Sequence, residues 1–105
     1  MTEDNTAEAR RKFAKEATRG LTGNAAATVP REQFLGHGPW LKLTFGGYEE
    51  TSTAASTEVY ELCALAIDPS LGINNGEPQL HAKMISAVAP KSGESIIHIG
   101  AGAGY

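Results

Sequence analysis

Residues 96–105 read IIHIGAGAGY, an apolar run that leads directly into three glycines spaced two residues apart. The stretch from Ser95 to Ile99 is rich in β-branched residues, which is typical of a central parallel strand covered on both faces. Glycines 100, 102 and 104 suit a loop that turns sharply and lets a ligand approach without Cβ atoms in the way. An α/β sheet holds its cofactor at such a loop, at the carboxyl end of a parallel strand. The stretch therefore predicts an α/β fold with a nucleotide-type site, and the alternative is a flexible glycine-rich end after an edge strand.

Length and composition describe an ordinary globular chain. The 105 residues allow one domain with a modest core, and 41% hydrophobic with 20% charged residues is a common balance. A net charge of −3 provides no electrostatic footprint for nucleic acid or for an anionic membrane. The acidic start, Met1 to Asp4, has no apolar stretch after it, and no run approaches transmembrane length. We expect a cytoplasmic protein without nucleic-acid or membrane partners.

The only cysteine is Cys63, which lies in the apolar run LCALAI at residues 62–67. A single cysteine cannot form an internal disulfide. No basic residue near it in the sequence would lower its pKa, so the sequence favours a buried, inert thiol over a nucleophile.

The first half predicts one long helix and little else that is regular. Asn5 and Glu8 form a capping box, and Ala9, Phe13 and Ala17 recur every four residues along one face. We expect the helix to end at Gly20. The other face is basic and is interpreted as a solvated surface rather than as a binding patch: Arg10, Arg11, Lys12, Lys15 and Arg19.

Residues 23–28 predict an irregular connection, and Pro30 predicts one short helical turn anchored by Phe34 and Leu35. Residues 40–45 alternate apolar and polar side chains, which favours a half-buried strand or an extended crossing segment. Residues 46–56 are small, polar and acidic, which predicts a mobile loop.

Residues 57–67 fit either a helix or a strand, and residues 68–77 predict a turn. Pro78 predicts the start of a second long helix, which Pro90 and Gly93 end. The apolar residues on one face of this helix are Leu80, Met84, Ala87 and Val88.

The glycine loop departs from the dinucleotide fingerprint at Tyr105, where that motif needs a small residue. This argues against NAD or FAD. The spacing, glycines at 100, 102 and 104 followed by tyrosine, resembles the first motif of class I S-adenosylmethionine-dependent methyltransferases.

Two further segments extend the resemblance. Residues 29–34, VPREQF, resemble the VPRxxF segment of the protein-L-isoaspartate O-methyltransferase family. Residues 77–84, EPQLHAKM, are similar to that family's QPxxxAxM helix, and residues 92–105 are similar to its PGxxVLxIGxGxGY run. The order and spacing of these segments agree from residue 29 to residue 105. The resemblance implies the amino-terminal part of a Rossmann-like methyltransferase fold, truncated after its first core strand and mostly helix and loop. Residues 1–76 would be a helical, substrate-side region, and residues 77–105 would begin the cofactor-binding domain.

The resemblance also implies a site for S-adenosylmethionine and a protein or peptide acceptor whose carboxyl group becomes a methyl ester. Methyl transfer from a sulfonium needs positioning and exclusion of water, so we expect no catalytic triad and no metal. The implied cofactor-binding residues are His98, Gly100, Ala101, Gly102, Gly104 and Tyr105. The implied substrate-side residues are Asn75, Gly76, Glu77 and Pro78.

The chain departs from the family at both sides of that site. The family carries Thr or Ser just before its QP pair, where this chain has Asn75 and Gly76, and Glu77 replaces the Gln. A different acceptor within a related methyltransferase group is therefore an alternative. His98 stands where the family has an acidic residue that helps place the cofactor's amino group. It would donate or accept a neutral hydrogen bond there, or would be a strand-end histidine satisfied by backbone.

Two functions from different classes remain. The first is an amino-terminal methyltransferase fragment, expected to be inactive by itself because most of the sheet and the acidic ribose-binding residue are missing. The second is a small stand-alone helical interaction module whose apolar strand pairs with a partner chain. The oligomeric state does not follow from the sequence.

Overall fold

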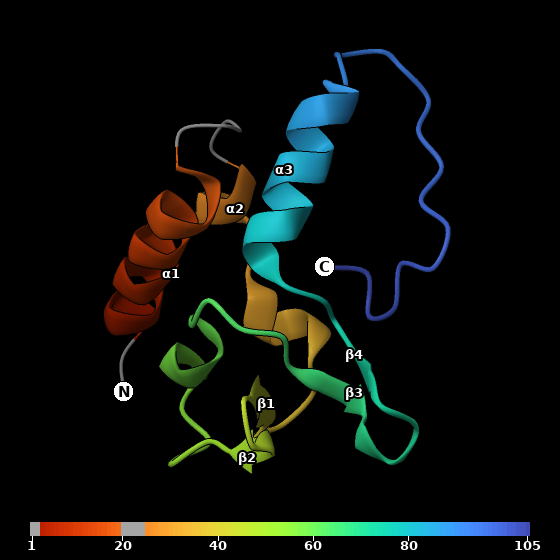
Figure 1. Ribbon diagram of the computed structural model, residues 1–105. Coiled ribbons are helices and arrows are strands. Elements are labelled where there is room, and N and C mark those ends of the chain that lie inside the picture. Colours follow the sequence, from red (N-terminus) through yellow and green to blue (C-terminus); the bar gives the residue numbers. More distant parts are fainter. Residues whose placement is uncertain (1–2, 20–24) are drawn as a thin grey trace.

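Three α-helices and two small antiparallel sheets form the part of the chain that the computed structural model describes, residues 3–19 and 25–105. The helices are α1 (Glu3–Thr18), α2 (Ala25–Thr28) and α3 (Pro78–Val88), and they occupy the upper and left parts of Figure 1. The two-stranded sheets lie below them. The prediction of a chain that mixes helix and strand is confirmed at this level, whereas both sheets of the described residues are antiparallel.

Helix α1 forms as the apolar spacing predicts. Phe13 and Ala17 are buried, and Ala9 packs against the same cluster. The helix begins at Glu3, so Asn5 lies inside its first turns and the predicted capping box is wrong. The predicted stop at Gly20 lies outside the described residues. Short helix α2 occupies part of the predicted irregular connection, where alanines favour helix.

The first sheet pairs β1 (Leu41–Thr44) with β2 (Gly47–Glu50) in an antiparallel hairpin. The predicted strand is confirmed in β1. The predicted mobile loop is wrong at β2, because Gly47 adopts a φ of 110° that lets the chain turn back directly after Thr44. The polar sequence of β2 gives no alternation by which the strand could be recognised.

The second sheet pairs β3 (Ala66–Asp68) with β4 (Ile73–Asn74), and a one-turn helix followed by Gly72 joins them. The segment that fitted helix or strand contains both, since a helical turn at Ser56–Val59 precedes the strand β3. Backbone pairing between Lys42 and Leu65 links the two sheets. The second sheet thus lies between the first hairpin and helix α3 in the chain, and β4 ends shortly before Pro78.

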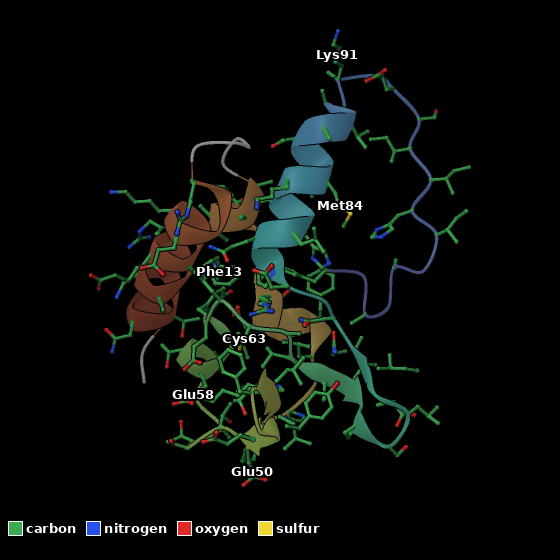
Figure 2. The ribbon with its side chains drawn as sticks, viewed as in Figure 1. Phe13, Glu50, Glu58, Cys63, Met84 and Lys91 are labelled. Carbon is green, nitrogen blue, oxygen red and sulfur yellow. The ribbon has the colours of Figure 1, made fainter. Side chains whose placement is uncertain are left out.

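The hydrophobic core lies between α1 and the loops beneath it (Figure 2). Val59 and Leu65 are fully buried, and the ring of Phe13 meets that of Tyr60 edge to face with centroids 5.4 Å apart. The buried cluster comprises Phe13, Ala17, Trp40, Val59, Tyr60 and Leu65. Burial of each large side chain contributes about 1.5–3 kcal/mol, so these contacts hold α1 against the middle of the chain.

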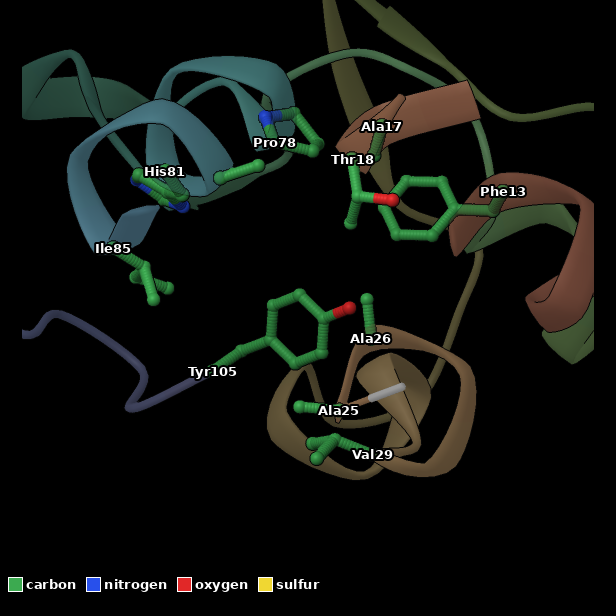
Figure 3. Close-up of a pocket in the computed structure, with 11 residues that line it drawn as sticks. Phe13, Ala17, Thr18, Ala25, Ala26, Val29, Pro78, His81, Ile85 and Tyr105 are labelled. Atoms are coloured by element: carbon green, nitrogen blue, oxygen red, sulfur yellow. The ribbon is translucent and has the colours of Figure 1, made fainter. Parts of the chain in front are cut away.

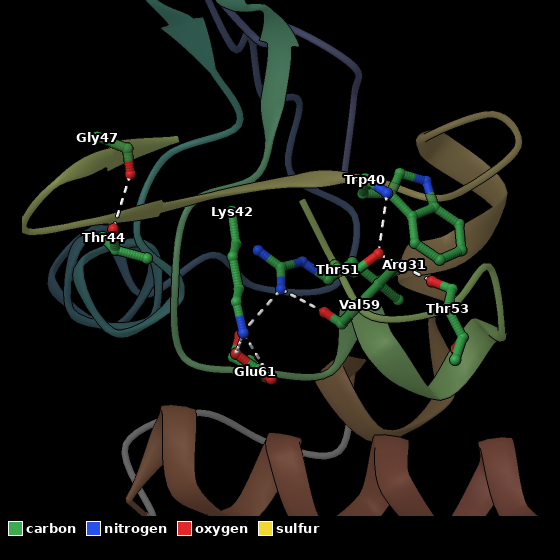
Figure 4. A network of polar contacts seen from close by, with 9 residues as sticks. All are labelled: Arg31, Trp40, Lys42, Thr44, Gly47, Thr51, Thr53, Val59 and Glu61. Carbon is green, nitrogen blue, oxygen red and sulfur yellow. Dashed lines mark hydrogen bonds and ion pairs between the residues drawn. The ribbon is translucent and has the colours of Figure 1, made fainter. Parts of the chain in front are cut away.

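Arg31 is an unusual member of this interior, since only 1% of it is exposed. Its guanidinium donates hydrogen bonds to the carbonyl oxygens of Val59, Glu61 and Cys63 (Figure 4 shows the first of these). Much of segment 59–63 lacks regular structure, so these carbonyls have no strand partner and Arg31 satisfies them instead. The helical turn Arg31–Phe34 that Pro30 predicts is confirmed and positions this side chain.

Helix α3 begins at Pro78 as predicted, but its apolar face is turned outward. Leu80 and Met84 are about half exposed and Val88 is 70% exposed, while Pro78 and Ala82 are buried. Pro78 and Ala82 lie on the side of α3 nearest α1, while Leu80, Met84 and Val88 lie on its exposed side.

The predicted parallel strand at Ser95–Ile99 does not form. These residues pair with no strand in the described chain, and the segment runs unpaired from the end of α3 back toward the middle of the molecule (Figure 1). Ile97 and Ile99 are 88% and 90% exposed. A strand apolar on both faces needs neighbours for its backbone and covers for its side chains, and the described residues supply neither.

Candidate functional site

The glycine loop encloses a small polar pocket, which we call the glycine-loop pocket, of about 170 Å3. Gly100 and Gly102 line it with positive φ angles of 74° and 59°, a backbone that other residues adopt only under strain. The residues that line it are Asn74, Asn75, Gly76, His81, His98, Gly100, Ala101, Gly102, Ala103 and Tyr105. Five predicted cofactor-binding residues and two predicted substrate-side residues thus meet in one pocket.

The other predicted site residues lie elsewhere. Glu77 caps α3, where its carboxylate accepts a hydrogen bond from the Gln79 amide at 3.1 Å. Pro78 is buried at the first turn of the same helix. The Gly104 amide donates to the Ala101 carbonyl and closes the loop on itself. These residues shape the pocket from outside.

Asn75, which follows strand β4, lines the glycine-loop pocket together with the loop. Its Oδ1 accepts a hydrogen bond from the Leu65 amide at 2.7 Å, which ties it to the core. Its Nδ2 is buried and has no hydrogen-bond partner among the described residues. A buried donor without a partner is costly and is rare in native structures, so this amide is suited to a ligand that accepts a hydrogen bond.

Gly76 brings the chain close to His81. Its φ is 79°, and a Cβ placed there would lie 2.5 Å from the His81 Nε2 atom. Any larger residue would push the imidazole away, so the glycine fixes the distance between the β4 end and α3. The side chain of neighbouring Asn74 accepts from the Gly76 amide at 2.9 Å and holds the turn.

His81 is a pocket residue that the sequence did not single out for this role. Burial lowers its pKa, and the positive charge of Arg31 and the nearby His98 lower it further. The imidazole is therefore neutral at pH 7 and offers one donor and one acceptor. Its position on α3, one turn after Pro78, was the available signal.

Tyr105 joins the glycine loop to the helical turn Arg31–Phe34, which is far away in the sequence. Its ring meets that of Phe34 edge to face with centroids 5.7 Å apart, and the Arg31 guanidinium carbon lies 5.7 Å from its ring centre. Desolvation raises its pKa, so the phenol stays protonated at neutral pH. The end of the glycine loop is thereby anchored on the helical turn that follows Pro30.

A second cavity, the apolar cavity, lies between the three helices and has a volume of about 180 Å3. Tyr105 projects into it from the loop, opposite Phe13 and Thr18 on α1 (Figure 3). Its lining comprises Phe13, Ala17, Thr18, Ala25, Ala26, Val29, Pro78, His81, Ala82, Ile85 and Tyr105.

A polar network behind this cavity was missed by the sequence reasoning. The Tyr60 hydroxyl donates to the Glu32 carboxylate and accepts from Arg10 Nε at 2.8 Å. Arg10 also forms an ion pair with Glu32 at 3.3 Å, so one residue of the predicted solvated basic face is partly buried. Spacing along α1 could not reveal this pairing, because both partners lie in other segments.

No nucleophile stands out. Cys63 is half-buried, and desolvation raises the pKa of its thiol above the usual value, which lowers the fraction of reactive thiolate. Within residues 3–19 and 25–105, no group of three His, Cys, Asp or Glu side chains gathers closely enough to hold a metal ion. In the same residues, no helix has the length and apolar character that crossing a membrane requires.

Comparison with known proteins adds nothing to this geometry. No protein-family model, no curated protein and no solved structure matches the chain. Any assignment of function therefore depends on the residues and their arrangement.

Proposed function

We propose that this chain carries the donor-binding loop of an S-adenosylmethionine-dependent methyltransferase, which methylates a carboxyl group of a protein or peptide. The proposal follows the resemblance to the protein-L-isoaspartate O-methyltransferase family. The cofactor would lie against the backbone of residues 98–105, with Asn75 and Gly76 on the acceptor side.

The observation that carries the proposal is the meeting of the three resembling segments around Tyr105. Val29 of the first segment, together with Pro78 and His81 of the second, lines one cavity with Tyr105 of the third. Phe34, also of the first segment, packs on the Tyr105 ring. Segments that merely resemble a motif by chance have no reason to converge in space.

Methyl transfer requires the side chains to position the donor and the acceptor rather than to react with them. S-adenosylmethionine supplies a methyl group on a sulfonium that is already activated for in-line displacement by a carboxylate oxygen. The glycines let the backbone approach a ligand closely, and the unpartnered Nδ2 of Asn75 would donate to the acceptor and orient it. Neutral His81 adds a hydrogen-bonding group without a charge that would repel the sulfonium.

The affinity for the cofactor depends on how firmly the rest of the chain holds the glycine loop. Within residues 3–19 and 25–105, no strand pairs with residues 95–99, and no atom lies within 4 Å of where a Cβ of residue 100 would stand. An unsupported loop loses conformational entropy when a ligand orders it. We therefore expect weak binding of the cofactor, with a Kd of about 1 mM.

Titration of the chain with S-adenosylhomocysteine, followed by amide NMR, tests the proposal. We expect saturable shifts at residues 98–105 and at Asn75. Gly100→Ala should abolish them, because a side chain at a φ of 74° strains the loop. Gly93→Ala is the matched control, since Gly93 has a φ of 86°, nothing within 4 Å and no place in the pocket. Absence of shifts in the unaltered chain, or equal loss in both variants, would refute the proposal.

The second candidate function, an interaction module, is favoured by one specific observation. Ile97 and Ile99 are almost fully exposed beside an unpaired backbone, and Met84 and Val88 add exposed apolar surface on α3. An unpaired apolar segment is a template for pairing with another chain. Light scattering tests this candidate, which predicts a discrete oligomer, whereas a monomer at all concentrations contradicts self-association.

A further inference from the structure

The apolar cavity and the glycine-loop pocket are neighbours that share two walls, His81 and Tyr105. Both side chains therefore line both the polar and the apolar space. A ligand held in the glycine-loop pocket therefore lies beside the apolar cavity, with these two side chains at the boundary.

The described residues that line the apolar cavity carry no formal charge at neutral pH. Among the described residues that line it, Thr18 carries the only hydroxyl besides that of Tyr105, and it already donates to the Ala14 carbonyl at 2.8 Å inside α1. Burial keeps His81 neutral by lowering its pKa and keeps Tyr105 protonated by raising its pKa. These described walls offer no partner to an ionised group, whereas an apolar group needs none.

The size of the cavity limits what it can hold. Its volume is about 180 Å3, and an engineered protein cavity of about 150 Å3 lined by apolar side chains binds benzene. A single aromatic ring or a branched aliphatic group of similar size fits this volume.

The cavity is shaped in advance on the α1 side. The Phe13 ring is held edge to face by Tyr60 and lies 5.1 Å from the guanidinium carbon of Arg31. Arg31 also stacks on Tyr105, so one buried side chain fixes two walls. A preformed apolar wall binds a ligand without paying for its own ordering.

We infer that the apolar cavity takes an uncharged aromatic or branched aliphatic group of about benzene size, carried by the acceptor whose carboxyl group enters the glycine-loop pocket. The inference names the substrate class of the proposed methyltransferase, and in that respect it rests on the proposed function. The acceptors would be peptides in which an uncharged apolar side chain lies next to the residue whose carboxyl group is methylated.

The first experiment tests the cavity alone, with toluene as the probe. Titration followed by methyl NMR should shift the resonances of Ala26, Val29 and Ala82. Ala82→Phe fills the cavity and should abolish the shifts, and Ala87→Phe, exposed on the same helix, should leave them unchanged. If circular dichroism shows that Ala82→Phe fails to fold, Ala26→Phe on α2 fills the cavity from the other side. Absence of shifts with toluene overturns the inference.

The second experiment tests the source of the apolar group. Two blocked isoaspartyl dipeptides, one with Phe and one with Ser next to the isoaspartyl residue, are compared for binding. We expect the Phe peptide to bind about tenfold more tightly or better, and we expect Ala82→Phe to remove the difference. Equal affinities in the unaltered chain, together with toluene binding, would mean that a free apolar molecule occupies the cavity, and the inference as stated would fall.

Failure of the two proposals can be told apart. If toluene and the Phe peptide bind while S-adenosylhomocysteine does not, the cavity stands as an apolar-group site and the methyl-donor proposal fails. If S-adenosylhomocysteine binds and toluene does not, the donor proposal stands and the cavity inference fails.

Discussion

The guanidinium carbon of Arg31 lies 5.1 Å from the centre of the Phe13 ring, deep enough that Arg31 is only 1% exposed. Its hydrogen bonds go to backbone carbonyls of segment 59–63, and its flat face lies on aromatic rings. A cation in this position is tolerated because the carbonyl dipoles and the ring faces replace the water it has lost. Arg31 thus connects helix α1, the loops of the core and the glycine loop.

We predict that Arg31→Lys lowers the free energy of unfolding by about 2–4 kcal/mol, because an ammonium cannot span three carbonyls with planar geometry and leaves acceptors unsatisfied. Urea unfolding followed by circular dichroism measures the change. Arg11→Lys, on the exposed face of α1, should alter stability by no more than about 0.5 kcal/mol. Equal changes in the free energy of unfolding for the two substitutions would show that the buried hydrogen bonds of Arg31 do not stabilise the fold.

Tyr60 makes the stability of the fold sensitive to high pH. Desolvation raises its pKa from its ordinary value near 10 to about 12, and the hydrogen bond to Glu32 adds to the shift. Protonated Tyr60 therefore makes its full contribution to the free energy of unfolding below about pH 10. That contribution is lost as the pH rises to about 12, because the tyrosine of the unfolded chain releases its phenolic proton first. We expect a loss on the order of 2 kcal/mol over that range.

The midpoint of urea unfolding, measured from about pH 9 to about pH 12, tests this expectation. Tyr60→Phe is the control, since it keeps the ring against Phe13 and removes the titrating group. Its pH profile should be flatter over the same range. An identical slope in both proteins would assign the effect to other groups.

The sequence predicted those elements whose signals are local. The stripe of Phe13 and Ala17 is repeated at helical spacing, and Pro78 marks a helix start by its fixed φ, so α1 and α3 were found. Strand β2 was not found, because its pairing depends on the turn geometry of Gly47 rather than on its own side chains. The strand at 95–99 failed for the opposite reason: its composition is that of a strand, but strands form only with partners.

The candidate site was partly predictable for a similar reason. The spacing of Gly100 and Gly102 predicts a sharply turning loop, and both residues have the positive φ angles that such a loop uses. The expectation that this loop shares a site with Asn75 and Gly76 came from the family resemblance, because no pattern of neighbouring residues predicts a contact between segments so far apart in the sequence. The place of His81 as a wall between two pockets arises only from tertiary packing, which places α3 beside the loop.

Glu77 separates structural support from ligand binding. Its carboxylate accepts from the Gln79 amide at the start of α3, so we predict that Glu77→Ala costs about 1 kcal/mol of stability. The same substitution should leave the affinity for S-adenosylhomocysteine within about twofold, because Glu77 does not line the glycine-loop pocket. Urea unfolding and the NMR titration give the two numbers. A large loss of affinity with unchanged stability would place Glu77 in the binding site after all.

Leu65 and Ile97 are large aliphatic residues in opposite environments, the first fully buried and the second 88% exposed. We predict that Leu65→Ala lowers the free energy of unfolding by about 2–5 kcal/mol, because it leaves a cavity in the core, while Ile97→Ala changes it by no more than about 0.5 kcal/mol. Amide exchange at residues 95–99 should be as fast as in an unfolded chain. If Ile97→Ala is instead destabilising and these amides are protected, the segment is covered by another chain. Ile97→Lys should then dissociate the assembly in light scattering, which would favour the interaction module over the methyl-donor site.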